Sequence, residues 1–224
     1  MMMNLFSIFD PSTSLTFSVN WFSGLYTIML IPLIFWFIPS RWNFILIKMM
    51  NFLFMEFKIL LVKKINNMNL LIFLSLFILI FLNNFMGLFP YIFTMSSHLT
   101  ISAALALTIW VSIFLFSWIN NYNHMFIHLV PQGTPSGLMP FMVLVESLSN
   151  FIRAGTLSIR LTANIIAGHL LMTLISSTGV NLNLIFLIFM LLSQSLLIIL
   201  EISVSLIQAY VFSVLSALYS AESN

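Results

Sequence analysis

Charged and titratable side chains lie inside long apolar stretches in the C-terminal half of this sequence. Five such side chains are present: Glu146, Arg153, Arg160, His169 and Glu201. Three amides accompany them: Asn150, Asn164 and Gln208. An ionisable group at membrane depth costs about 2.5 to 3.5 kcal/mol even on a lenient insertion scale, and such groups normally face a partner or a wet cavity. These residues therefore form the candidate functional site, and the alternative is that they only join helices through hydrogen bonds.

Helical spacing sorts these polar side chains into faces. Steps of three, four and seven residues place one set on a single stripe: Glu146, Ser149, Asn150, Arg153, Leu157, Arg160 and Asn164. His169 follows Arg160 by nine residues, and nine steps of about 100° put it on the opposite face. The next long segment carries a second stripe that could meet the His169 face: Gln194, Glu201, Ser205 and Gln208. The pattern predicts two polar routes separated by one arginine.

The side-chain types in these stripes suit the movement of protons. Carboxylates and imidazole titrate or relay protons, whereas arginine, with a pKa above about 12, stays cationic. We therefore expect Arg160 to act as a fixed positive barrier that attracts a carboxylate on a partner and stops a proton from crossing directly. Glu146 lies near the inner end of its segment and His169 nearer the outer end, so the two routes would open on opposite sides. Arg153 shares the Arg160 stripe but could equally lie near the inner headgroups.

The composition identifies the class of protein. Of 224 residues, 5% are charged and 61% are hydrophobic, with a mean hydropathy of +1.13, whereas roughly a quarter of the residues of a soluble domain are charged. We therefore predict an all-α integral membrane protein. A net charge of +2 rests on so few groups that it gives no reason to expect nucleic acid as a partner. The sequence contains no cysteine, which excludes disulfides, iron–sulfur clusters, thiolate zinc and a catalytic thiol.

Three uncharged segments are long enough to span a membrane, which takes about 20 apolar residues. They are residues 15–38, 69–89 and 99–119. Between the first two, residues 41–67 hold five of the seven basic residues, and the positive-inside rule places this loop on the inner side. Its charges alternate with apolar residues, as in an interfacial helix. Counting crossings from this loop places the N-terminus outside and the C-terminus inside.

The last two apolar segments are longer than a span requires. Residues 137–176 and 181–219 are each about 40 residues of helix-compatible sequence, separated by a short turn. A helix of that length is about 60 Å long, so crossing about 30 Å of hydrocarbon implies a tilt near 60°. Packing against a partner would have to hold such a tilt. The sequence thus predicts about five membrane helices plus one interfacial helix, with the last two long and steeply tilted as a hairpin.

Three motifs carry a resemblance to a known family. They are NNFMGLFPY at 83–91, HLVPQGTP at 128–135 and IRLTANIIAGH at 159–169. Across essentially its whole length the chain resembles subunit a of the F-type ATP synthases, in the mitochondrial form. The third motif is highly specific, because a permanent cation followed by Asn, Gly and His at this spacing is rare in an apolar helix.

The resemblance implies a non-catalytic stator subunit in the mitochondrial inner membrane, without cofactor or metal. It would stand beside a rotating ring of c subunits, whose carboxylates load and unload protons through two offset half-channels, and contact other membrane and peripheral-stalk subunits and lipid. Arg160 matches the essential arginine of the family. Asn164, His169, Glu201 and Gln208 match positions of the channel from the intermembrane space, and Glu146 and Asn150 match the matrix-side path. The N-terminus would lie in the intermembrane space and the C-terminus in the matrix.

Other classes of membrane protein fit the sequence less well. A haem protein needs paired histidines on facing spans, but His98, His124 and His128 lie at helix ends or in a loop, which leaves His169 alone. The i, i+4 spacing of His124 and His128 suits a metal, but no third ligand is near. A membrane subunit of a respiratory complex or a stand-alone secondary transporter stays an alternative, although a transporter would usually show internal repeats. No Gly-rich phosphate loop occurs, so nucleotide chemistry would belong to partners.

Overall fold

The protein is a bundle of long helices. The computed structural model describes residues 5–222 except 15, 33–34, 62–66, 131–134, 136 and 180–182, and these described residues contain helices but no strand. Four helices are long and apolar enough to cross a membrane: α3 (Asn67–Gly87), α4 (Leu99–Asn120), α6 (Met139–Thr178) and α7 (Leu184–Glu222). The prediction of an all-α, multi-pass membrane protein is confirmed.

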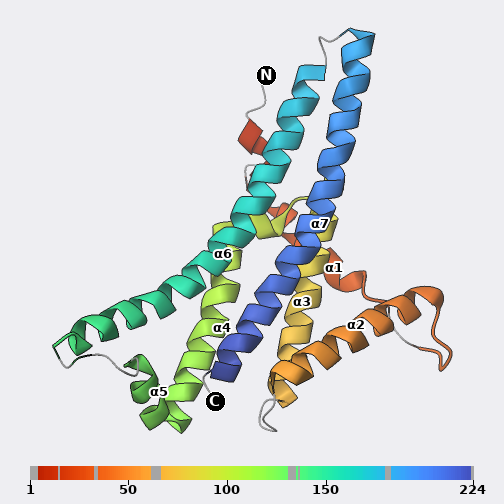
Figure 1. Ribbon diagram of the computed structural model, residues 1–224. Helices are drawn as coiled ribbons and strands as arrows, with labels where there is room; N and C mark the ends of the chain where they lie inside the picture. Colours follow the sequence, from red (N-terminus) through yellow and green to blue (C-terminus); the bar gives the residue numbers. More distant parts are fainter. Residues whose placement is uncertain are drawn as a thin grey trace.

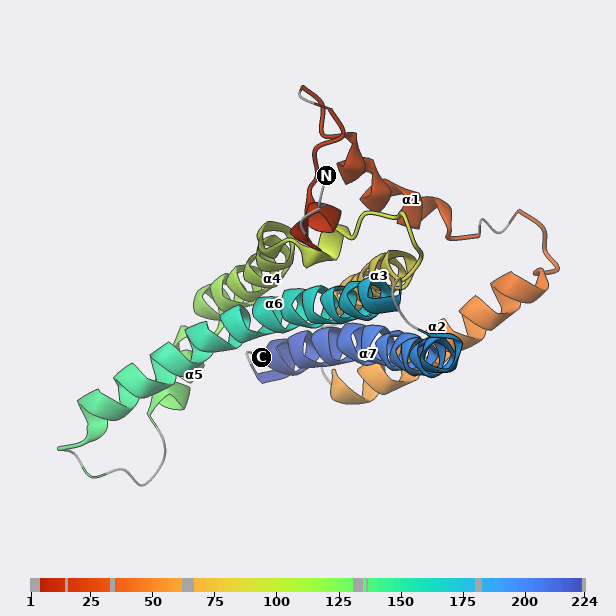
Figure 2. The ribbon, with the colours of Figure 1, turned by 90° about the horizontal axis from the view of Figure 1, so that it is seen from above.

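The four long helices form two layers. Helix α3 packs against α7, α4 packs against α6, and α6 lies beside α7, so the two views show α6 and α7 running together in front of α3 and α4 (Figure 1 and Figure 2). The buried core joins aromatic and aliphatic side chains of five helices, including Phe57, Phe77, Ala106, Leu161 and Phe212. This packing fixes which faces of α6 and α7 meet.

The second half of α7 packs through small side chains. Buried residues follow one face at helical spacing: Ser205, Ala209, Ser213, Ser216, Ala217 and Ser220. Small residues at a helix interface let the two backbones approach closely, which is how membrane helices associate without a hydrophobic driving force. The first half of α7, residues 184–200, has large apolar side chains that are mostly exposed. Contact with α3 therefore positions the second half of α7, and the first half is free for lipid or another protein.

The long hairpin is present as two continuous helices. Residues 137–176 and 181–219 correspond to α6 and α7, although residues 181–182 lie outside the described part. Proline is absent after Pro140, and α6 bends near its middle without losing its helical hydrogen bonding (Figure 1). The segments 69–89 and 99–119 correspond to α3 and α4 within two residues at each end. The steep tilt in the membrane stays a prediction.

The expected first span, residues 15–38, is not a continuous helix. A 3-10 helix η2 (Val19–Phe22) leads into α1 (Ser23–Met29), which has 7 residues, far short of the roughly 20 needed to cross. Helix α1 ends three residues before Pro32. Proline lacks the N–H of a helical hydrogen bond and disfavours helix in the residue before it. The described residues therefore contain four helices long and apolar enough to span a membrane, where about five were expected, and residues 15, 33 and 34 lie outside them.

Two shorter helices flank the bundle on the predicted inner side. Helix α2 (Arg41–Leu60) begins where the Ser40 side chain accepts a hydrogen bond from the Asn43 backbone N–H at 3.4 Å. It buries Leu53 and Phe57 against the bundle, and it accounts for most of segment 41–67, whose place at the membrane surface stays a prediction. Helix α5 (Tyr122–Leu129) occupies part of the stretch expected to be a loop.

Candidate functional site

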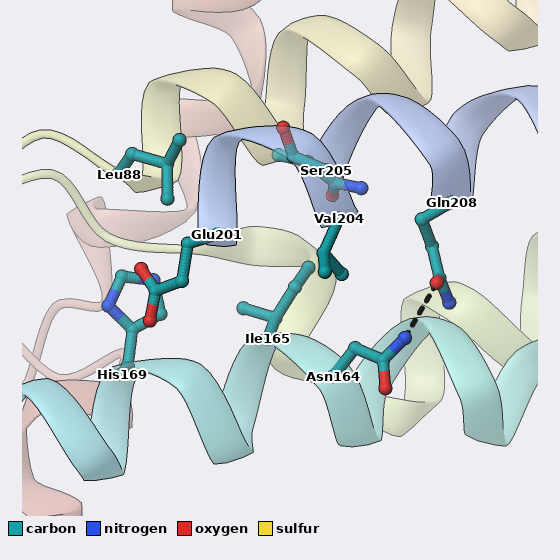
Figure 3. A pocket seen from close by; sticks show the side chains of 9 residues that line it. Leu88, Asn164, Ile165, His169, Glu201, Val204, Ser205 and Gln208 are labelled. Atoms are coloured by element: carbon teal, nitrogen blue, oxygen red, sulfur yellow. Dashed lines mark hydrogen bonds between the residues drawn. The ribbon is translucent and has the colours of Figure 1, made fainter. Parts of the chain in front are cut away.

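His169 of α6 and Glu201 of α7 line the same small cavity. Its volume is about 30 Å³, and Figure 3 shows both side chains directed into it. The lining comes from α3, α6 and α7 and from the turn after α3: Asn84, Leu88, Asn164, Ile165, His169, Glu201, Val204, Ser205 and Gln208. Three residues of the stripe that was expected to meet the His169 face, Glu201, Ser205 and Gln208, line the cavity with His169, whereas Gln194 of the same stripe does not.

Gly168 makes room for the Glu201 carboxylate. A Cβ atom added at Gly168 would collide with Oε1 of Glu201 and would lie 3.0 Å from Cδ and 3.2 Å from Cγ. Real Cβ atoms tolerate such distances only if the neighbour moves. The glycine in the motif IRLTANIIAGH therefore has a steric reason: it lets an acidic side chain lie directly on the backbone of α6, next to His169.

Gly168→Ala is expected to lower the proton flux that the resemblance implies several-fold without loss of assembly, because the Glu201 carboxylate must leave its place beside His169. The measurement is the ATP-driven acidification of vesicles that the resemblance to subunit a leads us to expect of the assembled complex. Gly155→Ala is the matched control, since a Cβ at Gly155 meets nothing within 4 Å and both changes raise helix propensity equally. Equal flux in the two variants would show that the Gly168 contact does not matter.

A hydrogen bond closes the other end of the cavity. The Asn164 amide N–H donates to Oε1 of Gln208 at 2.7 Å and joins α6 to α7 (Figure 3). Gln208 is 7% exposed. Both amides were singled out in the sequence, and the structure brings them together.

Several buried polar atoms at the cavity have no hydrogen-bond partner among the described residues. These atoms are both carboxylate oxygens of Glu201 and both side-chain polar atoms of Asn84. An unsatisfied buried polar group costs about 1 to 3 kcal/mol, and a polar cavity of this size is large enough for about one water molecule. The cavity is thus suited to hydrate, and to exchange a proton with, the Glu201 carboxylate.

The His169 imidazole is confined on two further sides. The Phe9 ring of the 3-10 helix η1 (Leu5–Phe9) meets it edge-on, with ring centroids 6.3 Å apart. A Cβ at Gly87 would lie 3.9 Å from its Nε2 atom. His169 therefore lies where α3, α6, α7 and the N-terminal segment converge.

Arg160 has a different environment from the cavity. Its side chain is exposed, and no hydrogen bond or ion pair to it is found in the described part of the chain. A permanent cation on an apolar spanning helix requires a counter-charge, so we expect the missing partner to come from another chain. Arg153, by contrast, lies over the Tyr219 ring, 5.6 Å from its centroid.

Glu146 and Asn150 lie apart from the cavity. They are partly exposed on the first half of α6, which diverges from α7 in Figure 1. The stripe predicted from Glu146 to Asn164 does not face one environment throughout, because Leu157 lies in the core whereas Arg160 is exposed. The structure thus brings together four of the predicted site residues: Asn164, His169, Glu201 and Gln208. Glu146 and Asn150 lie elsewhere.

Comparison with known proteins gives this arrangement a family. A family model described as ATP synthase A chain matches residues 17–221. Over 224 residues the sequence is 54% identical to "ATP synthase subunit a" of Drosophila melanogaster, covering 100% of both chains. The chain belongs to the ATP synthase A chain family. It is also 56% identical over 223 residues to "ATP synthase subunit a" of Locusta migratoria, with 99% of each chain covered, and 54% identical over 226 residues to that of Anopheles gambiae, with 100% covered.

Membership in the ATP synthase A chain family carries the function of a proton-translocating subunit of the membrane sector. The alternatives, a stand-alone transporter or a membrane subunit of a respiratory complex, receive no support from these matches. Among the described residues no group of three or more His, Cys, Asp or Glu is placed to hold a metal. The side chains of His124 and His128 lie outside the described residues.

One polar residue that lines the ATP synthase A chain site was not assigned from the sequence. Asn84 is 4% exposed and reaches the cavity from α3. It belongs to the motif NNFMGLFPY, where two amides end an otherwise apolar span, and that placement is the signal that could have identified it.

Proposed function

We propose that this chain is the stator half of a rotary proton path, in which Arg160 separates two offset half-channels beside a ring of c subunits. Asn164, His169, Glu201 and Gln208 form the half-channel from the intermembrane space, and Glu146 and Asn150 form the matrix half-channel. A ring carboxyl group takes up a proton from the first half-channel and releases it to the second. The chain adds no covalent step, and nucleotide chemistry belongs to other subunits.

One observation supports this proposal most directly: a cavity lined by two titratable side chains lies close to Arg160, which has no partner among the described residues. Arg160 is one helical turn from Asn164, whose amide donates to Gln208 at the edge of the cavity. A ring carboxylate attracted to Arg160 would therefore be near the cavity. Because the guanidinium stays protonated at any physiological pH, it repels a proton but does not conduct it.

We further propose that the chain lies in the mitochondrial inner membrane, with its N-terminus in the intermembrane space and its C-terminus in the matrix. The four long helices alone would leave both ends on one side, so the segment between η1 and α2 makes the further crossing. The contact of the Phe9 ring with His169 supports an outer position for the N-terminal segment. The basic segment 41–67 supports this orientation, because it would then lie on the matrix side. The cavity is nearer the α6–α7 turn than Glu146 is, so the two half-channels would open to opposite compartments.

Single cysteines test the two openings, since the chain has none of its own. With Ser205→Cys, which lines the cavity, we expect silver ions to inhibit ATP-driven proton pumping only when added on the intermembrane-space side. With Asn150→Cys we expect inhibition only from the matrix side. Silver is suited to this test because it is small and binds the thiolate that forms only in wet surroundings.

Leu192→Cys is the control, because its side chain lies on the exposed apolar face of α7 and should be insensitive from either side. Inhibition of Ser205→Cys and Asn150→Cys from one and the same side would rule out half-channels that open to opposite compartments.

A further inference from the structure

A hydrogen bond joins α7 to the peripheral helix α2. The Tyr210 hydroxyl donates to Oε2 of Glu56 at 3.1 Å, across 154 residues of sequence. The two helices pack against each other, and α2 crosses near the end of the bundle where α7 finishes (Figure 1). Neither residue belongs to the half-channels assigned above.

The pair lies beyond the cavity on the way to the inner side. Along α7, Tyr210 follows Glu201 by nine residues and Gln208 by two, so it lies about 13 Å further toward the C-terminal end than Glu201. Two helical steps also turn it away from Gln208: Gln208 is 7% exposed, whereas Tyr210 is 38% exposed. The Tyr210 hydroxyl is thus on the accessible face of α7. Because Asn164 contacts Gln208 and Arg153 contacts Tyr219, the antiparallel register places Tyr210 level with residue 162 of α6, about half a helical turn from Arg160.

Among the residues that the structure describes, no cation pairs with the Glu56 carboxylate; Lys63 and Lys64 lie outside them. Helix α3, which packs against α2, carries no charged residue, and α7 contributes Tyr210 and Tyr219 besides the distant Glu201 and Glu222, whose side chain is outside the described part. On α2 itself Lys48 and Lys58 are exposed, and Lys48 lies over the Phe44 ring at 5.1 Å. In the described residues the hydroxyl of Tyr210 is the polar group that contacts Glu56.

A hydrogen bond that only held α2 against α7 would not need an acidic residue. An amide would accept the same hydrogen bond without the cost of placing an ionisable group against apolar helices. A carboxylate next to a hydroxyl on an accessible face is instead able to take a proton and pass it on.

We propose that Glu56 and Tyr210 form a proton-transfer pair on the inner side, a branch of the release path separate from Glu146 and Asn150. This proposal rests on the rotary function proposed above. A ring carboxylic acid gives its proton to the Tyr210 oxygen while the Tyr210 hydroxyl proton moves to Oε2 of Glu56. The ring group is left as a carboxylate, Tyr210 is unchanged, and Glu56 then loses the proton to water on the inner side and regains its negative charge.

Glu56→Gln separates this role from a structural tie, because the amide oxygen can still accept the hydrogen bond but cannot carry the proton. In vesicles with the assembled synthase we expect ATP-driven proton flux to fall several-fold. We also expect the dependence of the flux on inner-side pH to change while its dependence on outer-side pH does not. Tyr210→Phe keeps the ring packing and should have the same effect, and the double variant should be no slower than the slower single variant.

Lys58→Gln, two residues away on α2, controls for the loss of a charged side chain from this helix and should keep the normal flux. Normal flux and a normal inner-side pH profile in Glu56→Gln would overturn the proposal, as would a Tyr210→Phe variant that only lowers the yield of assembled complex. If Glu56→Gln does not assemble, unchanged flux in Tyr210→Phe would also overturn the proposal. Loss of pumping in Arg160→Ala together with normal flux in Glu56→Gln would reject this pair and leave the rotary function standing.

Discussion

Arg160→Ala is expected to abolish ATP-driven proton pumping while leaving the complex assembled. The side chain is exposed and unpaired within the described part of the chain, so its removal leaves no hole in the core and no orphaned carboxylate among those residues. What is lost is the positive charge between the two half-channels. The measurement is acidification of vesicles by the variant complex, with subunit content checked in the same preparation.

The reason for so large an effect is leakage. One proton crossing 100 mV is worth about 2.3 kcal/mol, and that energy is lost if a proton passes between the half-channels without turning the ring. Arg160→Lys tests whether any positive charge is enough at this position. Lysine restores a charge but can lose its proton when desolvated, and it lacks the planar fork that binds a carboxylate. We expect Arg160→Lys to recover little of the flux. Normal acidification in Arg160→Ala would contradict the assignment of this residue.

Removing His169 and Glu201 together is expected to cost no more than removing the more important one alone. Each of Glu201→Gln and His169→Gln should slow proton flux by roughly 10²-fold, the lower end of what a proton-transfer group supplies. Because both side chains line one cavity of about 30 Å³, a proton that passes one of them passes the other. The double-variant cycle of turnover rates therefore measures their coupling.

His98 supplies the matched control for that cycle. It is another histidine on the outer side, but it packs against Trp21 with ring centroids 5.0 Å apart and does not line the cavity. His98→Gln combined with Glu201→Gln should show independent effects. Fully independent effects of His169→Gln and Glu201→Gln would disprove a single proton-uptake unit.

Most of the long helices could be predicted from the sequence, but which helices pack against one another could not. Helices α3, α4, α6 and α7 could be predicted because each is an uninterrupted apolar run, and a helix continues in lipid unless proline stops it. The same reasoning failed for residues 15–38, because this apolar run contains Pro32 and α1 ends at Met29. A proline near the end of a run is enough to stop a helix that has little packing to support it.

The site residues that lie on facing sides of α6 and α7 could be predicted from their helical spacing. Spacing along α6 and α7 was enough to pair His169 with Glu201, since the hairpin makes their faces meet. Spacing along one helix does not say which third helix lies alongside, so Asn84 from α3 was not assigned. The contact of Glu56 with Tyr210 spans 154 residues and depends on where α2 crosses the bundle, which no local pattern encodes.

The contrast between the two halves of α7 predicts where substitutions are tolerated in evolution. In residues 184–200, one large apolar side chain can replace another at little cost, since most of them face outward. Where serines and alanines lie against α3, one added methylene forces the backbones apart and costs about 1 to 3 kcal/mol. Substitutions should therefore accumulate in the first half of α7 and be removed by selection from the second half, so the first half should vary more between related sequences.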